Sequence, residues 1–156
     1  MKLIKTTTMA TLFSGLLLCI TASANNEQGK VTPEEAECVV AKENATSTDS
    51  LDDRLDRANK AIKVCLKAAE AGSLEAQEAL MYLYMDISFK KFKESVKWAR
   101  KAVDNGSVRA QRALGVMYFE GYGVEKDRQQ AKKWLTKACN NNNQGACYLL
   151  KEYNLN

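Results

Sequence analysis

Histidine does not occur in this sequence of 156 residues. Its absence removes the side chain that most often acts as a general base, activates a serine or cysteine nucleophile, or binds a metal ion. Proline occurs once, and β-branched runs are scarce, while alanine, leucine, lysine and glutamate dominate. The composition indicates an all-helical protein. No residue pattern suggests a catalytic residue or a cofactor, so we predict that the protein is not an enzyme.

A strong excess of charge of one sign is also lacking. The formal net charge is +4 at neutral pH. Lys2 and Lys5 are the only charged residues among the first 24, so removing that segment would lower the net charge to +2. A sum so close to zero points to neither a nucleic acid nor an anionic membrane as a partner.

The first 24 residues have the pattern of a secretory signal peptide. A positively charged start is followed by a short apolar run, residues 9–20, and by the cleavage motif Ala22-Ser23-Ala24. The apolar run is too short to span a bilayer comfortably. We therefore expect cleavage after Ala24, a flexible mature N-terminus over residues 25–31 and a helical domain over residues 32–156. The mature protein is expected in the periplasm, without insertion into the membrane.

Four of the five cysteines lie in the predicted mature chain: Cys38, Cys65, Cys139 and Cys147. An even number of cysteines in an exported chain indicates two disulfides, and four cysteines allow three pairings. A zinc site would need closely spaced pairs of ligands, which are missing here. A reactive thiol would need a neighbouring histidine or another basic activator. We therefore predict two disulfides and no metal site.

The sequence repeats itself with a period of about one helical hairpin. Lys67, Lys101 and Lys137, each followed by alanine, recur at intervals of 34 and 36 residues. Trp98 and Trp134 each stand three residues before the repeated lysine. Repeats of this length are typical of helical hairpins that stack into a solenoid. The apolar periodicity predicts hairpins over about 33–71, 73–104 and 107–140, and a closing helix over 144–154.

The pair Gly121 and Gly123 raises the question of a phosphate-binding loop. Such a loop follows a strand and continues as G-x-G-x-x-G, and neither feature is present. The equivalent loop of the middle unit, residues 85–88, has no glycine, although the helices on either side are kept. Both glycines can adopt positive φ at little steric cost. The sequence therefore predicts a turn between two helices, with Asp127 as the N-cap of the second.

Residues 110–138 resemble the Sel-one-like repeat, a relative of the tetratricopeptide repeat. The matching positions are Ala110, Leu114, Gly115, Tyr118, Gly121, Gly123, Val124, Asp127, Ala131, Trp134, Lys137 and Ala138. The middle unit, residues 76–102, keeps part of this pattern but has Met81 where the family has glycine, so we expect atypical packing in that hairpin. Trp98 and Trp134 occupy packing positions of the repeat and are expected in the core.

The resemblance implies a fold and a cysteine pairing. The fold would be all-α, an αα-hairpin solenoid wound as a right-handed superhelix, with about three hairpins and a C-terminal capping helix. The positions of Cys139 and Cys147 resemble those in exported, cysteine-containing members of the family. This resemblance implies that the two cysteines face each other across an inter-repeat turn. Cys38 and Cys65 lie nearly symmetrically about the loop of the first hairpin and would join its two helices.

The resemblance also implies that the protein binds another protein through a concave face lined by the first helix of each hairpin. By register with tetratricopeptide repeats, the outward positions of these helices and of the cap are Glu75, Glu78, Tyr82, Met85, Arg109, Arg112, Val116, Phe119 and Tyr148. The partner would be an envelope protein or a secreted toxin. Two alternatives remain open: an immunity protein that neutralises a type VI-type periplasmic toxin, and a binder or hydrolase of a small molecule or peptidoglycan fragment.

Overall fold

The computed structural model describes residues 32–45, 50–86 and 90–155. These residues form seven helices and contain no β-strand. The helices are α2 (Pro33–Ala45), α3 (Leu51–Glu70), α4 (Leu74–Met85), α5 (Phe92–Asp104), α6 (Val108–Glu120), α7 (Arg128–Asn140) and α8 (Gln144–Glu152). The predicted signal peptide, the predicted flexible segment 25–31, residues 46–49 of the first predicted hairpin and residues 87–89 of the middle one lie outside the described residues.

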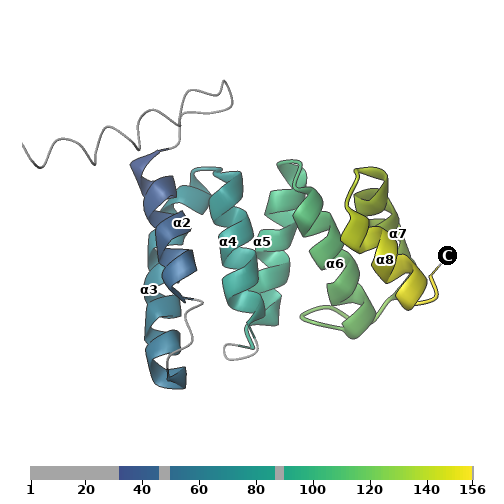
Figure 1. Ribbon diagram of the computed structural model, residues 1–156, viewed down its shortest axis with the longest axis horizontal. Coiled ribbons are helices and arrows are strands. Elements are labelled where there is room, and N and C mark those ends of the chain that lie inside the picture. The colour runs from purple at the N-terminus through teal and green to yellow at the C-terminus, as the bar shows by residue number, and fades with distance from the viewer. Residues whose placement is uncertain (1–31, 46–49, 87–89, 156) are drawn as a thin grey trace, which may run out of the picture. The chain divides into compact units, whose positions relative to one another are not determined.

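Residues 33–156 form one compact unit. Within this unit each helix contacts the next one along the chain, and α4 also contacts α2 and α6. Figure 1 shows the helices of this unit following one another in chain order, from the α2–α3 hairpin to the α6–α7 hairpin and the closing helix α8. The first helices α2, α4 and α6 are therefore neighbours, and α8 closes the series. The predicted all-α hairpin solenoid is confirmed.

The turns between successive hairpins share one backbone design. Each contains a residue with positive φ at the same place in the repeat: Gly72 (101°), Gly106 (90°) and Asn142 (63°). Asparagine is among the few residues with a side chain that tolerate this conformation. The residue that follows caps the next helix in all three turns: Ser73, Ser107 and Asn143. Its backbone N–H donates to a carbonyl five residues earlier at 2.8–3.0 Å, which satisfies the end of the preceding helix.

The turn between α6 and α7 contains the two glycines and is not a phosphate-binding loop. Gly121 and Gly123 have φ values of 79° and 72°, and the N–H of Gly121 donates to the carbonyl of Met117 at 2.8 Å. The side chain of Asp127 accepts from two N–H groups in the first turn of α7, at 2.9 and 3.0 Å. A Cβ at Gly123 would collide with the backbone of Phe92. The glycines therefore allow both the turn and its close approach to α5, and the predicted turn is confirmed.

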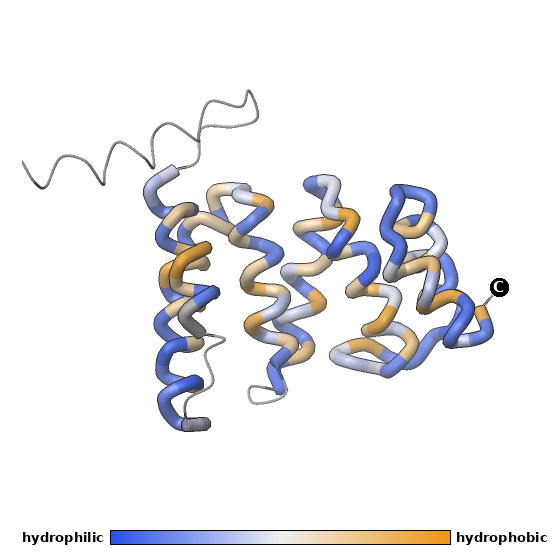
Figure 2. Tube along the Cα trace, viewed as in Figure 1, coloured by the Kyte–Doolittle hydropathy of each residue, from blue (hydrophilic) through white to orange (hydrophobic). Residues whose placement is uncertain are grey.

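Small side chains make up much of the core, which lets the helices approach one another closely. Fully buried alanines occur in six of the helices: Ala61, Ala76, Ala99, Ala102, Ala110, Ala131, Ala138 and Ala146. Trp98 is buried as expected, whereas Trp134 is half-buried. Figure 2 shows hydrophobic and hydrophilic stretches alternating along the helices. No helix in the described part of the chain is long and apolar enough to cross a membrane.

The middle hairpin accommodates Met81 by a complementary change of size. In the last full hairpin, Gly115 of α6 lies against Leu135 of α7, because a Cβ at Gly115 would come within 2.5 Å of Leu135 Cγ. At the equivalent positions the middle hairpin has Met81 on α4 and the small Ala99 on α5, both fully buried. The larger side chain has thus moved from the second helix to the first. This exchange explains how α4 and α5 remain in contact although the repeat's glycine is missing.

A buried glutamine recurs in α4 and α6 and binds the following inter-hairpin turn. Gln77 and Gln111 are 3% and 4% exposed. Asn105 Nδ2 donates to Gln77 Oε1 at 2.9 Å, and Asn141 Nδ2 donates to Gln111 Oε1 at 3.1 Å. Because buried polar groups are costly without partners, these bonds fix the position of each turn relative to the first helix of the hairpin before it, α4 or α6.

Two disulfides connect neighbouring helices. Cys38 and Cys65 join α2 to α3 with a Cα–Cα distance of 4.6 Å, and Cys139 and Cys147 join α7 to α8 with 4.8 Å. These are the two pairs that the family resemblance implies. The first pair is fully buried and the second is half-buried. By loop entropy they contribute about 3.6 and 2.6 kcal/mol to stability, which matters in a short solenoid with a small core.

Candidate protein-binding groove

A groove of about 510 Å³ crosses the first helices of the hairpins, from α2 over α4 to α6 and the start of α8. Its walls are Val39, Lys42, Glu75, Glu78, Ala79, Tyr82, Arg109, Arg112 and Asn143. Five of the nine residues predicted to bind a partner are therefore together in one groove: Glu75, Glu78, Tyr82, Arg109 and Arg112.

An ion pair fixes the middle of this groove. Arg109 Nη1 of α6 lies 3.0 Å from Glu78 Oε2 of α4, and the hydroxyl of Ser107 donates to the other carboxylate oxygen at 2.5 Å. The Glu78 side chain is only 14% exposed, whereas that of Arg109 is 71% exposed. The hydrogen bond from Glu78 raises the pKa of the Arg109 guanidinium. The pair ties two consecutive hairpins together and holds a charged arginine at the rim of the groove.

The remaining charged residues of the groove form no salt bridge with another described residue. Arg112 of α6 is half-buried, and its Nη1 would be 3.0 Å from a Cβ at Gly145, so the guanidinium lies against the start of α8. Lys42 of α2 and the exposed Glu75 of α4 line the same groove. The ring of Tyr82 lines it as well and is half-buried. An aromatic ring bordered by arginines is a common composition of protein interfaces.

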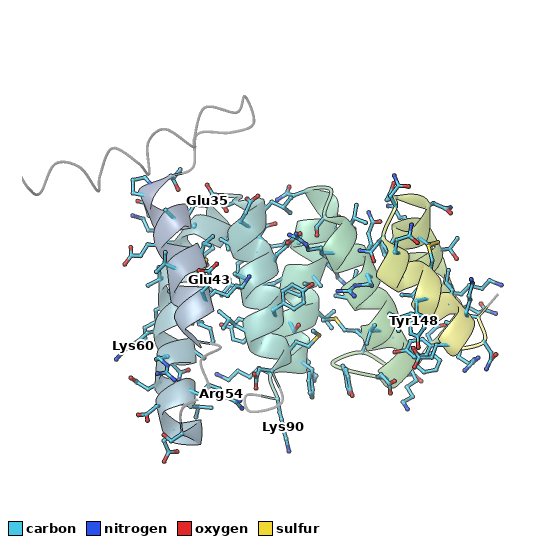
Figure 3. All side chains as sticks on the ribbon, viewed as in Figure 1. Glu35, Glu43, Arg54, Lys60, Lys90 and Tyr148 are labelled. Atoms are coloured by element: carbon cyan, nitrogen blue, oxygen red, sulfur yellow. A yellow bond between two sulfur atoms is a disulfide. The ribbon has the colours of Figure 1, made fainter. Side chains whose placement is uncertain are left out.

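The other four predicted residues lie outside the walls of the groove. Met85 and Val116 are half-buried, and Met85 packs against the core. The ring of Phe119 is stacked on that of Tyr153, with centroids 3.7 Å apart, and is therefore covered by the C-terminal residues instead of pointing freely outward. Tyr148 of α8 is 64% exposed and is labelled in Figure 3.

The sequence prediction missed four residues that line the groove: Val39, Lys42, Ala79 and Asn143. Val39 and Lys42 belong to α2, where the repeat is so divergent that its register gave no outward positions. Asn143 could have been found, because it precedes α8 just as Ser73 and Ser107 precede α4 and α6.

A second, more open hollow of about 920 Å³ lies between α5 and the beginning of α7. Arg100, Tyr118 and residues 124–130 line it. Arg100 Nη2 of α5 donates to the Tyr118 hydroxyl of α6 at 3.2 Å. Among the residues that the structure describes, no group of three or more His, Cys, Asp or Glu side chains could hold a metal ion.

The stacked hairpins and the groove across their first helices define the class of this molecule, an α-helical repeat protein. The Sel1 repeat family matches residues 79–107 and 108–143. The chain therefore contains two Sel1 repeats, and the resemblance seen in the sequence is confirmed. Sel1 repeats typically serve as non-enzymatic scaffolds for interactions between proteins.

Solved structures of other proteins share this fold. A Sel1 repeat protein from Oxalobacter formigenes is 24% identical, with a TM-score of 0.56, and the match covers 86% of this chain and 98% of that one. A protective antigen of uropathogenic Escherichia coli strains, which displays an SLR fold, is also 24% identical with a TM-score of 0.56. That match covers 86% of this chain but only 34% of the antigen. No curated protein sequence matches the chain.

Proposed function

We propose that this protein binds a partner protein in the periplasm through the groove over α2, α4 and α6. The observation that carries the proposal is the convergence of Tyr82, the Glu78–Arg109 pair and Arg112 on one groove built from separate hairpins. The signal-peptide pattern of residues 1–24 and the two disulfides support export, because disulfides form and persist in oxidising compartments.

The groove offers a partner both a rigid and an adaptable part. Because Glu78 already binds Ser107 and Arg109, this part of the surface needs little reordering when a partner arrives. Tyr82 supplies apolar area with few rotatable bonds. Lys42, Glu75 and Arg112 present charges of both signs, and a partner with the complementary pattern would be selected over others.

The origin of the partner separates two versions of this function. An envelope protein of the same cell would make the protein an adaptor, whereas a toxin delivered from another cell would make it an immunity protein. A small molecule or peptidoglycan fragment as ligand is the third candidate. The groove is open and carries a network between two hairpins, and the scaffold role typical of Sel1 repeats favours a protein ligand.

The test is affinity capture of a partner from envelope extract with the oxidised chain of residues 25–156. We expect the captured protein to be lost with Tyr82→Ala and with Arg112→Ala. Tyr122→Ala is the matched control, because Tyr122 is 39% exposed and does not line the groove. Retention of the partner by both groove variants, or equal loss with the control, would overturn the proposed site. Protection of cells against a purified periplasmic toxin by the wild type, and not by Tyr82→Ala, would identify the immunity version.

A further inference from the structure

The small net charge of the whole chain conceals two halves of opposite sign. Residues 33–86 contain six lysines and arginines against twelve acidic residues, a net charge of −6. Residues 90–156 contain fourteen basic against six acidic residues, a net charge of +8. Such asymmetry between halves indicates that the basic half meets an anionic partner.

The positive charge is concentrated on the second helices of the last two hairpins. On α5 the exposed cations are Lys93, Lys97, Arg100 and Lys101. Lys97 forms a weak ion pair with Glu94, at 3.8 Å and with both side chains at least half exposed. On α7, residues 128–140 contain four cations and no acidic residue.

The open hollow between α5 and the start of α7 joins these two groups of cations. Arg100 of α5, Lys126 of the turn and Arg128 of α7 line it together. Two acidic residues of the turn, Glu125 and Asp127, line it as well, so cations outnumber acids there by three to two. Lys132, Lys133 and Lys137 continue along α7 and are exposed. We call the exposed cations of α5, of Lys126 and of α7 the basic face.

Within the basic face the arginines have partners and most of the lysines do not. Arg100 donates to the Tyr118 hydroxyl at 3.2 Å, and Arg128 donates to the carbonyl of Tyr153 at 2.9 Å. Lys101 and Lys137 lie over tryptophan rings, with Nζ 4.5 and 5.5 Å from the ring centroids. The available groups are therefore mainly lysine ammonium ions, which act as point charges and lack the fixed fork of arginine.

The side chains around these lysines decide between the possible anionic partners. Specific protein interfaces are rich in aromatic residues and poor in lysine, and single-stranded nucleic acids need exposed rings for stacking. Among the described residues, the exposed large hydrophobic side chains are Val39, Val40, Tyr122 and Tyr148, and none of them belongs to α5 or α7. Tyr122 lies in the turn before α7 and stacks on Phe92 of α5, with ring centroids 4.9 Å apart. A cluster of lysines on helices with so few exposed apolar side chains is instead typical of surfaces that bind anionic lipid headgroups.

We infer that the basic face docks the protein onto the anionic phospholipid headgroups of a membrane surface, without insertion. The contact is electrostatic, so it weakens as added salt shortens the Debye length. The groove lies on residues of the first helices and the start of α8, whereas the basic face lies on α5, α7 and the turn before α7. A membrane-bound protein can therefore still hold a partner in its groove, and the two surfaces can be tested separately.

The test is co-sedimentation of the purified mature chain with vesicles of phosphatidylcholine, with and without phosphatidylglycerol. We expect binding to the mixed vesicles at low salt, little binding to pure phosphatidylcholine, and release at high salt. Lys132→Glu with Lys133→Glu should weaken binding at least about tenfold, since each cation near such a surface contributes about a factor of five. The matched control is Lys60→Glu with Lys63→Glu on α3. It changes the net charge equally, but α3 lies at the opposite end of the row of helices from α7 (Figure 1), so it should change binding about twofold or less.

Three outcomes would overturn the inference. Equal binding to both kinds of vesicle would show that the headgroup charge is not recognised. Equal loss with the α7 and α3 variants would show that only the net charge matters. Tighter binding of duplex DNA or polyglutamate than of the mixed vesicles, with the same dependence on Lys132 and Lys133, would assign the basic face to another macromolecule. Circular dichroism checks that each variant is folded, and Lys132→Gln with Lys133→Gln replaces the charge reversal if it is not.

Discussion

Gly115 of α6 and Leu135 of α7 form a complementary pair, because a Cβ at Gly115 would lie 2.5 Å from Leu135 Cγ and 3.2 Å from the Leu135 backbone nitrogen. The middle hairpin has the reverse combination, Met81 on the first helix and Ala99 on the second. Each of these two hairpins therefore has one large and one small residue at this position. The family's glycine is one solution to a volume constraint, and Met81 with a small partner is another.

Exchange of this pair should show strong coupling. Gly115→Met should destabilise the protein by about 1–3 kcal/mol, because the added side chain overfills the space beside Leu135. Combining it with Leu135→Ala, which recreates the Met81–Ala99 arrangement, should recover part of that loss, with a coupling energy of about 0.5–3 kcal/mol. Urea unfolding of the two single variants and the double variant measures the coupling. Strictly additive effects would show that the two positions do not share the space.

Removal of a buried glutamine should loosen the following turn. Gln111→Ala should lower the free energy of unfolding by about 1–3 kcal/mol, because the buried amide and its bond to Asn141 are lost together. Asn141→Ala should cost less, since Asn141 is exposed and water can replace part of the bond. Gln129→Ala, an exposed glutamine on α7, is the control and should stay within about 0.5 kcal/mol of wild type. A larger effect of Asn141→Ala than of Gln111→Ala would contradict this account.

The contact between α2 and α3 should respond to acid and to alkali. The hydrogen bond from Lys67, 2.9 Å long, lowers the pKa of Glu34, and the same contact raises the pKa of Lys67. The stabilisation through Glu34 is therefore present above its ordinary pKa and is lost as the pH falls through the lowered value. The stabilisation through Lys67 is present at neutral pH and is lost as the pH rises through the raised pKa of Lys67. The difference in urea midpoint between wild type and Glu34→Gln should be small at neutral pH and vanish in acid. A constant difference would assign it to some other contact of Glu34.

The prediction from sequence succeeded where the repeat is regular. The 34- and 36-residue spacing located the hairpins, and it placed Glu78, Tyr82 and Arg109 on one side of α4 and α6, where the groove lies. It failed for Phe119, because the covering ring comes from Tyr153 at the end of the capping helix α8. The matched repeat pattern ends before that residue, so the pattern gave no sign of the contact.

The divergent first hairpin and the charge pattern show two other limits. The walls of the groove from α2 were missed, because that helix shares almost no repeat position with the others. The basic face was missed for a different reason. The sequence contains the opposite charges of the two halves, but a single sum over the chain cancels them. Counting charge by predicted hairpin would have revealed it.

Gly123 should be more sensitive to a side chain than Gly72. Both have positive φ, so alanine at either position is strained by about 1–2 kcal/mol. A Cβ at Gly72 would meet nothing within 4 Å, whereas one at Gly123 would meet the backbone of Phe92. Gly123→Ala should therefore lower the thermal midpoint clearly more than Gly72→Ala. Equal losses would mean that backbone strain alone, and not the approach of the turn to α5, requires glycine at Gly123.

The two disulfides should differ in their resistance to reduction. Cys38 and Cys65 are fully buried, so a reductant reaches them when the first hairpin opens. Cys139 and Cys147 are half-buried at the junction of α7 and α8, and their reduction needs only local opening of the cap. Under a mild thiol reductant, followed by alkylation and peptide mass spectrometry, Cys139 and Cys147 should be labelled first while the far-ultraviolet circular dichroism stays close to native. Denaturing urea should remove the difference in rate, because it exposes both pairs. Equal labelling rates under native conditions would show that the first hairpin opens as readily as the cap, and that burial of Cys38 and Cys65 gives no kinetic protection.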